Sequence, residues 1–151
     1  MTRLWSAPGR EFATGEARFT SRPAHTFDRL ARIHLTVQIG AVHALAVLDT
    51  GGAYLVLDPV MAANVDIGEP VHAERIAIRG FVYNGTVHRI PITIPAEAGE
   101  PLTFEATAFV PELAAGEAWP LPSYLGWQGC LERIRFAVDP RAERVYFGTA
   151  G

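Results

Sequence analysis

The pattern of apolar and polar residues predicts a chain built mostly from short strands. Ile33, Leu35, Val37 and Ile39 alternate with polar residues, which is the period of a half-buried strand. Residues 44–48 form a continuous apolar run, which is typical of a strand covered on both faces. Further strands are expected over residues 54–57, 72–78, 86–94, 102–110, 135–138 and 144–147.

Turn and cap residues complete this outline. Asn84-Gly85 predicts the turn of a hairpin between the strands at 72–78 and 86–94, because both residues tolerate a positive φ. Asp58-Pro59 predicts the start of a short helix over 60–64, since Asp caps helices and Pro suits the first helical position. A second short helix is expected within 127–134. Together these elements predict a mainly β barrel with one or two short helices.

The length of 151 residues fits a single domain. Residues 1–25 lack clear periodicity, so we expect an irregular N-terminal arm there, with one strand near 16–20. Residues 26–151 are expected to form the folded domain.

Composition narrows the classes of function. Hydrophobic residues make up 49% of the chain and charged residues 19%, the profile of a folded globular protein. The net charge of −3 predicts no nucleic-acid partner, and no apolar run approaches the roughly 20 residues that span a bilayer. Cys130 is the only cysteine, which excludes an intrachain disulfide and favours a reducing compartment. Without a secretory signal at the N-terminus, a cytoplasmic location is expected.

Asp49 is the candidate for chemistry, because it directly follows the apolar run and begins the tripeptide Asp49-Thr50-Gly51. An ionised carboxylate is costly to bury unless it is hydrogen-bonded or shares a proton. In one interpretation Asp49 caps its own backbone at a strand-to-turn junction. In the other it is half of a pair of carboxylates that share one proton, and such a pair supplies both the base and the acid of amide hydrolysis.

Other constellations are weaker. The five histidines show no metal-ligand spacing, so no metal site and no cofactor are expected. Cys130 lies in the expected second helix, where a lone buried thiol usually serves packing.

The order of motifs resembles that of retropepsin-like aspartic proteases, including the single-domain bacterial relatives of retroviral proteases. The resemblance covers residues 31–148. It is carried by Val47-Leu48-Asp49-Thr50-Gly51, by a hairpin after it, and by Leu125-Gly126 followed by a helix and terminal strands. It implies a closed acid-protease-like barrel with one lobe per chain, and a peptide or protein substrate.

The resemblance also implies roles for individual residues. Asp49 would be the catalytic aspartate, Thr50 would hydrogen-bond across a dimer, and Gly51 would offer backbone to the substrate. Leu125 and Gly126 would support the active-site loop. Residues 79–86 would form the flap that closes over the peptide. The expected substrate-binding residues are Gly52, Ala53, Gly80, Phe81, Tyr83, Leu125 and Gly126.

The chain has one Asp-Thr-Gly where two-lobed relatives have two, so the resemblance implies a homodimer whose two-fold axis pairs Asp49 with its copy. Gly52 stands where the family usually has Ala or Ser, and Ala53 and Tyr54 stand where retroviral members place acids. Two alternatives therefore stay open: a non-catalytic peptide-binding or assembly module on the same fold, and an unrelated β-barrel in which the tripeptide is coincidental.

Overall fold

The computed structural model describes residues 5–7 and 10–151. Its helical elements are α1 (Pro59–Ala62) and the 3-10 helix η1 (Leu131–Arg133). Its strands are β1 (Trp5–Ala7), β2 (Arg10–Glu11), β3 (Gly15–Arg18), β4 (Thr20–Pro23), β5 (Ala31–Ile39), β6 (Val42–Leu48), β7 (Leu55–Val56), β8 (His72–Ile78), β9 (Phe81–Ile94), β10 (Ala98–Gly99), β11 (Leu102–Pro111), β12 (Ser123–Leu125), β13 (Ile134–Asp139) and β14 (Arg144–Thr149).

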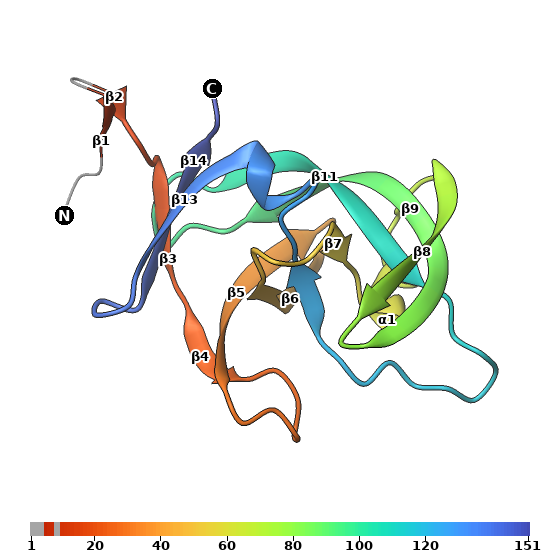
Figure 1. The fold of residues 1–151 in the computed structure, drawn as a ribbon. Helices are drawn as coiled ribbons and strands as arrows, with labels where there is room; N and C mark the ends of the chain where they lie inside the picture. Colours follow the sequence, from red (N-terminus) through yellow and green to blue (C-terminus); the bar gives the residue numbers. More distant parts are fainter. Residues whose placement is uncertain (1–4, 8–9) are drawn as a thin grey trace.

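One eight-stranded sheet dominates the molecule, with the strand order β4-β5-β6-β12-β7-β11-β9-β8 (Figure 1). β5 also meets β9 at the pair Gln38–Thr93, so the sheet curves back toward itself. A four-stranded sheet, β10-β3-β14-β13, lies beside it, and β1 pairs with β2. The expected mainly β fold is confirmed.

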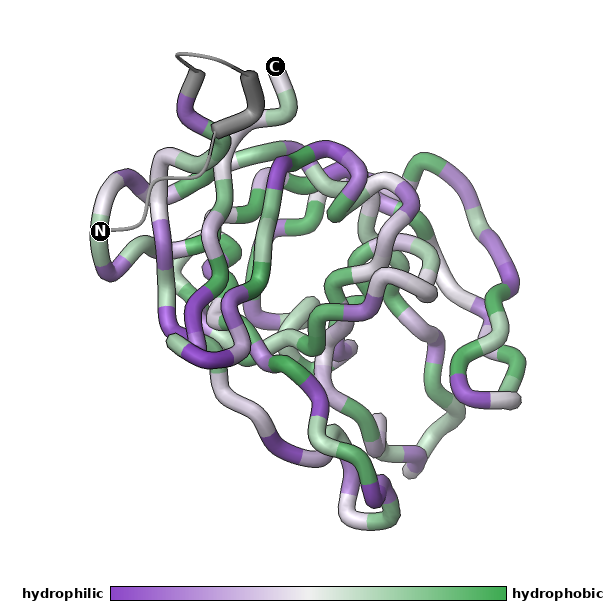
Figure 2. Tube along the Cα trace, turned by 60° about the vertical axis from the view of Figure 1, so that its left-hand side comes forward, coloured by the Kyte–Doolittle hydropathy of each residue, from purple (hydrophilic) through white to green (hydrophobic). Residues whose placement is uncertain are grey.

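The period-two pattern located its strands well. β5 spans Ala31–Ile39, with Leu35, Val37 and Ile39 buried as the alternation predicts. β13 and β14 pair antiparallel around the turn at 140–143, as expected. Figure 2 shows the same alternation of hydrophobic and hydrophilic positions along the strands.

The hairpin turn lies elsewhere than predicted. Ile78 pairs with Phe81, so the turn residues are Arg79 and Gly80, with φ of 51° and 82°, and β9 runs on through Asn84-Gly85. Gly85 serves packing instead, because a Cβ there would overlap the Val110 carbonyl oxygen. A close approach between β9 and β11 therefore overrides the local turn signal.

Two further expectations differ from the structure. Part of the expected irregular arm is integral to the sheets, since β3 pairs with β14 and β4 pairs with β5. The helix expected within 127–134 is reduced to the 3-10 helix η1, because Gly129 has a φ of 70° and the backbone of Trp127 is bonded to another loop. The first helix is confirmed: the Asp58 carboxylate accepts a hydrogen bond from the Val60 N–H at 2.8 Å.

The core divides into two buried clusters. The larger lies between the sheets and includes Leu35, Ile92 and Phe147. The smaller groups Val47, Val56, Val87, Phe109, Leu121 and Tyr124. Each fully buried large apolar side chain contributes about 1.5–3 kcal/mol relative to exposure. The smaller cluster supports the strands that end at Asp49, and so fixes the position of the candidate site.

Candidate active site

Three neighbouring strands position Asp49. β12 lies between β6, to which it is parallel, and β7, to which it is antiparallel. Leu125 pairs with Leu48, and the Asp49 N–H donates to the Leu125 carbonyl at 2.9 Å. Asp49 therefore stands at the end of β6, directly beside the end of β12. The two segments on which the resemblance rests are brought together here.

The loop after β6, residues 49–54, is called the Asp49 loop below. The backbone of residues 126–128 holds it: Gly126 N–H donates to the Tyr54 carbonyl at 2.8 Å, and Trp127 N–H donates to the Gly52 carbonyl at 2.7 Å. Tyr54 N–H returns a bond to the Gln128 carbonyl at 3.0 Å. A Cβ at Gly126 would overlap the Tyr54 carbonyl oxygen, so glycine is required for this approach.

The Asp49 side chain is half-buried and turns back on its own loop. Its Oδ1 accepts from the Gly51 N–H at 3.0 Å, and its carbonyl accepts from the Gly52 N–H at 3.2 Å. A Cβ at Gly52 would lie 2.9 Å from Asp49 Oδ2, so the glycine gives this carboxylate its room. Thr50 and Gly51 are exposed, and Gly51 also borders the cleft described next.

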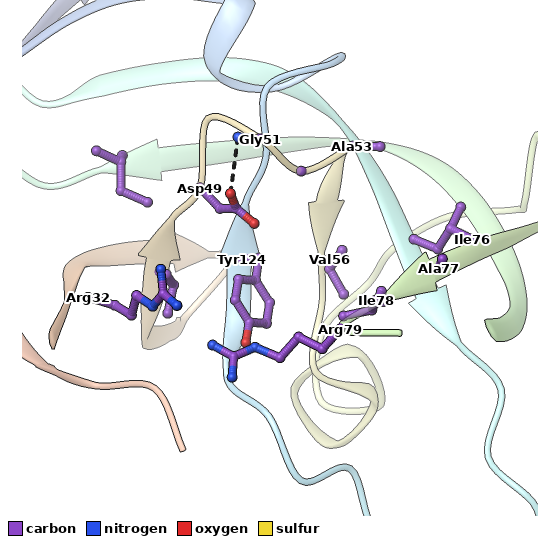
Figure 3. Close-up of a pocket in the computed structure, with 13 residues that line it drawn as sticks. Arg32, Asp49, Gly51, Ala53, Val56, Ile76, Ala77, Ile78, Arg79 and Tyr124 are labelled. Atoms are coloured by element: carbon purple, nitrogen blue, oxygen red, sulfur yellow. Dashed lines mark hydrogen bonds between the residues drawn. The ribbon is translucent and has the colours of Figure 1, made fainter. Parts of the chain in front are cut away.

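A cleft of about 350 Å³ opens in front of Asp49 (Figure 3). Its floor comes from the ends of β6 and β12 and from the Asp49 loop, and its other wall comes from β8. The lining residues are Arg32, Val47, Leu48, Asp49, Gly51, Gly52, Ala53, Val56, Ile76, Ala77, Ile78, Arg79 and Tyr124. Among these described residues Asp49 is the single carboxylate.

The cleft contains four of the residues singled out from the sequence, namely Asp49, Gly51, Gly52 and Ala53. Leu125 and Gly126 lie buried behind the Asp49 loop, and Thr50 lies on its outer side. Gly80, Phe81 and Tyr83 do not line the cleft, because the turn at Arg79-Gly80 places β8 there instead.

Sequence reasoning missed Arg32 and Tyr124. Tyr124 directly precedes Leu125-Gly126, so its place in β12 could have indicated that it lies near Asp49. Arg32 stands in the exposed first part of β5 and carries no local signal. Only the pairing of β5 with β6 carries Arg32 to the cleft.

Asp28 gathers two arginines at the edge of the cleft. Its Oδ2 accepts from Arg79 Nη2 at 2.9 Å and from Arg32 Nε at 3.2 Å, and its Oδ1 accepts from the Leu30 N–H. The bond from Arg79, joined by those from Leu30 and Arg32, holds the pKa of the Asp28 carboxyl well below its usual range. Asp28 thereby ties the turn of the β8–β9 hairpin to the segment that precedes β5.

Tyr124 lies next to Arg79 in the cleft (Figure 3). Its side chain is 6% exposed, and its hydroxyl oxygen has no hydrogen-bond partner among the described residues. Burial raises the pKa of Tyr124, although the neighbouring Arg79 partly opposes that rise. A tyrosine hydroxyl beside an arginine can accept from it and still donate its own proton, so this group can donate to a ligand.

A second side-chain contact joins the Asp49 loop to the hairpin. The Tyr54 hydroxyl donates to Glu74 Oε1 at 3.2 Å, while Glu74 Oε2 is buried without a partner among the described residues. Burial, followed by the contact with Glu74, raises the pKa of Tyr54. Tyr54 has a φ of 61°, an uncommon value for a residue with a side chain.

The other candidate groups from the sequence, a cysteine and the histidines, do not form a catalytic or metal site within the part of the chain that the structure describes. Cys130 is fully buried, and burial raises its pKa to about 12, so it is no thiolate nucleophile near neutral pH. His34 and His88 are buried, and each contacts a backbone carbonyl. Within residues 5–7 and 10–151, no three His, Cys, Asp or Glu side chains cluster closely enough to hold a metal ion.

No helix in the described part of the chain has both the length and the apolar character needed to cross a bilayer. The expected cytoplasmic location stays a prediction.

Comparison with solved structures identifies the fold of this chain. No protein-family model matches the chain, and no curated protein matches it with significance. Among solved structures, a retropepsin-like aspartic protease from Rickettsia conorii aligns with a TM-score of 0.53 and 16% identity, over 87% of this chain and 97% of that one. The retroviral protease-like domain of Ddi1 from Leishmania major aligns with a TM-score of 0.45 and 16% identity, over 78% and 94%. The chain therefore has the retropepsin-like fold.

Proposed function

We propose that this protein is an aspartic endopeptidase whose active site forms when two copies of the chain pair their Asp49 carboxylates. The observation that carries this proposal is a lone carboxylate at the end of β6, just after the buried Ala46 and Val47, opening on a cleft that offers no second acid among its described residues. The rest of β6 is half-buried or exposed, so the expected cover on both faces is not found. The retropepsin-like fold supports it, because the Rickettsia structure is described as an aspartic protease.

The chemistry requires both copies. Two carboxylates that share one proton cannot both ionise, so one stays a base while its partner stays an acid. The base takes a proton from the attacking water as the oxygen bonds to the peptide carbonyl, and the acid protonates the departing nitrogen. The bond from the Gly51 N–H orients the Asp49 carboxylate for this role.

The outer side of the Asp49 loop supports pairing with a second copy. Thr50 and Gly51 are exposed there, and Trp127, bonded to the same loop, is 46% exposed. A two-fold axis beside this surface would bring the two Asp49 residues together, with Thr50 bonding across it. An extended peptide would then lie between Gly51–Ala53 backbone and the β8–β9 hairpin, with Gly80, Phe81 and Tyr83 reaching it when the hairpin closes.

The decisive experiment compares the wild-type protein with Asp49→Asn in peptide cleavage and in sedimentation. We expect wild-type protein to cleave peptides as a dimer, and Asp49→Asn to lose at least about a hundredfold in kcat/KM while still dimerising. Asp66→Asn is the matched control, because Asp66 is exposed and only caps its own turn through the Gly68 N–H. It should cleave as the wild type does.

Two results would overturn the proposal. A chain that stays monomeric at all concentrations cannot pair its acids. A dimer that binds peptides but cleaves none would instead be a non-catalytic binding module, the alternative that the missing methyl at Gly52 first suggested.

A further inference from the structure

The cleft in front of Asp49 is lined by two arginines and one carboxylate. Arg32 and Arg79 both line it, and both bond to the same oxygen of Asp28. Each of these bonds uses one of the five N–H donors of a guanidinium. In one copy the two guanidinium groups face two carboxylates, Asp28 and Asp49, so these charges balance. In the proposed dimer the two Asp49 carboxylates share one proton, which leaves one positive charge per dimer.

The same end of the cleft holds a buried hydroxyl. Tyr124 is 94% buried, as its exposed fraction of 6% shows, and its hydroxyl has no partner among the described residues. Figure 3 shows this hydroxyl beside the Arg79 guanidinium, on the side of the ring away from Asp49. A buried hydroxyl next to the Arg79 guanidinium is a ready donor to an anion.

The backbone conformation of Arg79 is uncommon for a residue with a side chain. A two-residue turn of this kind requires positive φ at both positions and favours Asn or Gly. Arg79 adopts a φ of 51° all the same, and its guanidinium is fixed by Asp28. A residue in this conformation persists only where its surroundings hold it, and the bond to Asp28 does so for Arg79.

We propose that Tyr124, Arg79 and Arg32 form a carboxylate-binding subsite in the Asp49 cleft, which selects peptides with an acidic side chain beside the scissile bond. Asp28 acts as a positioning residue, because it orients both guanidinium groups without lining the cleft. This inference rests on the proposed peptidase function and names the substrate class of that same site. The apolar lining from Val47, Val56 and Ile76 would hold the stem of the acidic residue.

The test uses matched peptides that differ only in Glu or Gln at the positions flanking the cleaved bond, each with an amidated C-terminus. We expect wild-type protein to prefer Glu by about tenfold or more in kcat/KM, since a charged hydrogen-bonding partner is lost in the Gln peptide. Tyr124→Phe and Arg79→Met should each lower this Glu-to-Gln ratio toward one. Arg75→Met is the control, because Arg75 is an exposed arginine of β8 outside the cleft lining, and it should keep the ratio.

The outcomes separate this inference from the proposed function. Cleavage that depends on Asp49 but shows no preference for Glu overturns the subsite and leaves the peptidase standing. Preference only for peptides with a free C-terminus overturns the acidic side chain as the ligand and assigns the carboxylate to the chain end.

If no peptide is cleaved, fluorescence anisotropy of labelled Glu and Gln peptides decides the subsite independently. Tighter binding of the Glu peptide, weakened by Tyr124→Phe and not by Arg75→Met, supports it. Equal binding of the two peptides overturns it.

Discussion

The Asp49 loop and the β8–β9 hairpin face each other across the cleft, but they are held by different kinds of contact. Backbone hydrogen bonds to residues 126–128 fix the Asp49 loop, and a glycine too crowded for any side chain lies behind it. The turn of the hairpin is tied by side chains, namely Arg79 to Asp28, and its strand by Glu74 to Tyr54.

Exposure follows the same division. Leu125 behind the Asp49 loop is fully buried, whereas Phe81 and Val82 after the hairpin turn are 68% and 59% exposed. Backbone hydrogen bonds beside the buried Leu125 and Gly126 open only with large parts of the fold. An ion pair whose arginine is 36% exposed contributes less and breaks more readily. The difference suits an enzyme that keeps its acid fixed and lets the opposite wall move to admit a substrate.

The largest loss of stability is expected from a substitution that adds a side chain behind the Asp49 loop. Gly126→Ala should lower the free energy of unfolding by about 3 kcal/mol, because the new Cβ overlaps the Tyr54 carbonyl oxygen and the surrounding backbone must shift. Urea denaturation measures the loss. Gly51→Ala is the control, since its Cβ would meet only Asp49 Oδ1 at an ordinary 3.5 Å. An equally stable Gly126→Ala protein would show that the loop is not tightly held.

Removing the hydroxyl that links the loop to β8 should have a smaller effect. Tyr54→Phe should cost about 1 kcal/mol at neutral pH, because the half-buried Glu74 carboxylate loses its donor. Tyr83→Phe is the control on the same hairpin, where the ring packs edge-on against Trp119 at 5.2 Å and is retained.

Measuring the stability of Tyr54→Phe at alkaline pH tests the same hydrogen bond in a second way. The pKa of Tyr54 is raised in the folded state, so its contribution is fully present below the unfolded value of about 10 and is lost as pH rises through the raised value. The stability of wild type and Tyr54→Phe should therefore converge at strongly alkaline pH. A difference that persists there would mean that the hydroxyl acts by another route.

Removing the ion pair between Asp28 and Arg79 should have the smallest and most local effect. Asp28→Asn should speed hydrogen exchange at residues 79–82 by roughly two- to fivefold, because the Arg79 side chain of this ion pair is 36% exposed, which limits its contribution even though the Asp28 side chain is only 7% exposed. Asp66→Asn should leave exchange at the hairpin turn as it is, since Asp66 caps a turn elsewhere.

The pH dependence of this ion pair follows from the lowered pKa of Asp28. Its contribution is present above the ordinary carboxyl value of about 3.9 and is lost only as pH falls through the lowered value. The ratio of the hydrogen-exchange rates of Asp28→Asn and wild-type protein at residues 79–82 should therefore be the same at pH 4.5 as at pH 7. A ratio that falls to one at pH 4.5 would show that the pKa of Asp28 is raised above its ordinary value instead of lowered.

Local patterns predicted the strands and Asp49 because burial with period two leaves a direct trace in the residue order. The Asp58-Pro59 cap was likewise readable, since a helix start depends on neighbours in sequence. The hairpin turn was not, because Gly85 is needed for contact with Val110 and Phe109, which lie far away in sequence. One strand was expected near 16–20, and β3 (Gly15–Arg18) lies there. The pairing of β3 with β14 and of β4 with β5 was not predicted, because local patterns do not encode it.

The sequence by itself determined a mainly β chain and a carboxylate at the end of an apolar strand, since both can be read from the local order of apolar and polar residues. Only the tertiary structure decided what surrounds that carboxylate. Arg32 arrives on β5, Tyr124 on β12 and Arg79 on the hairpin, from segments separated by tens of residues. Strand pairing across the sheet, which no local pattern encodes, brings their charges and the buried hydroxyl into one cleft.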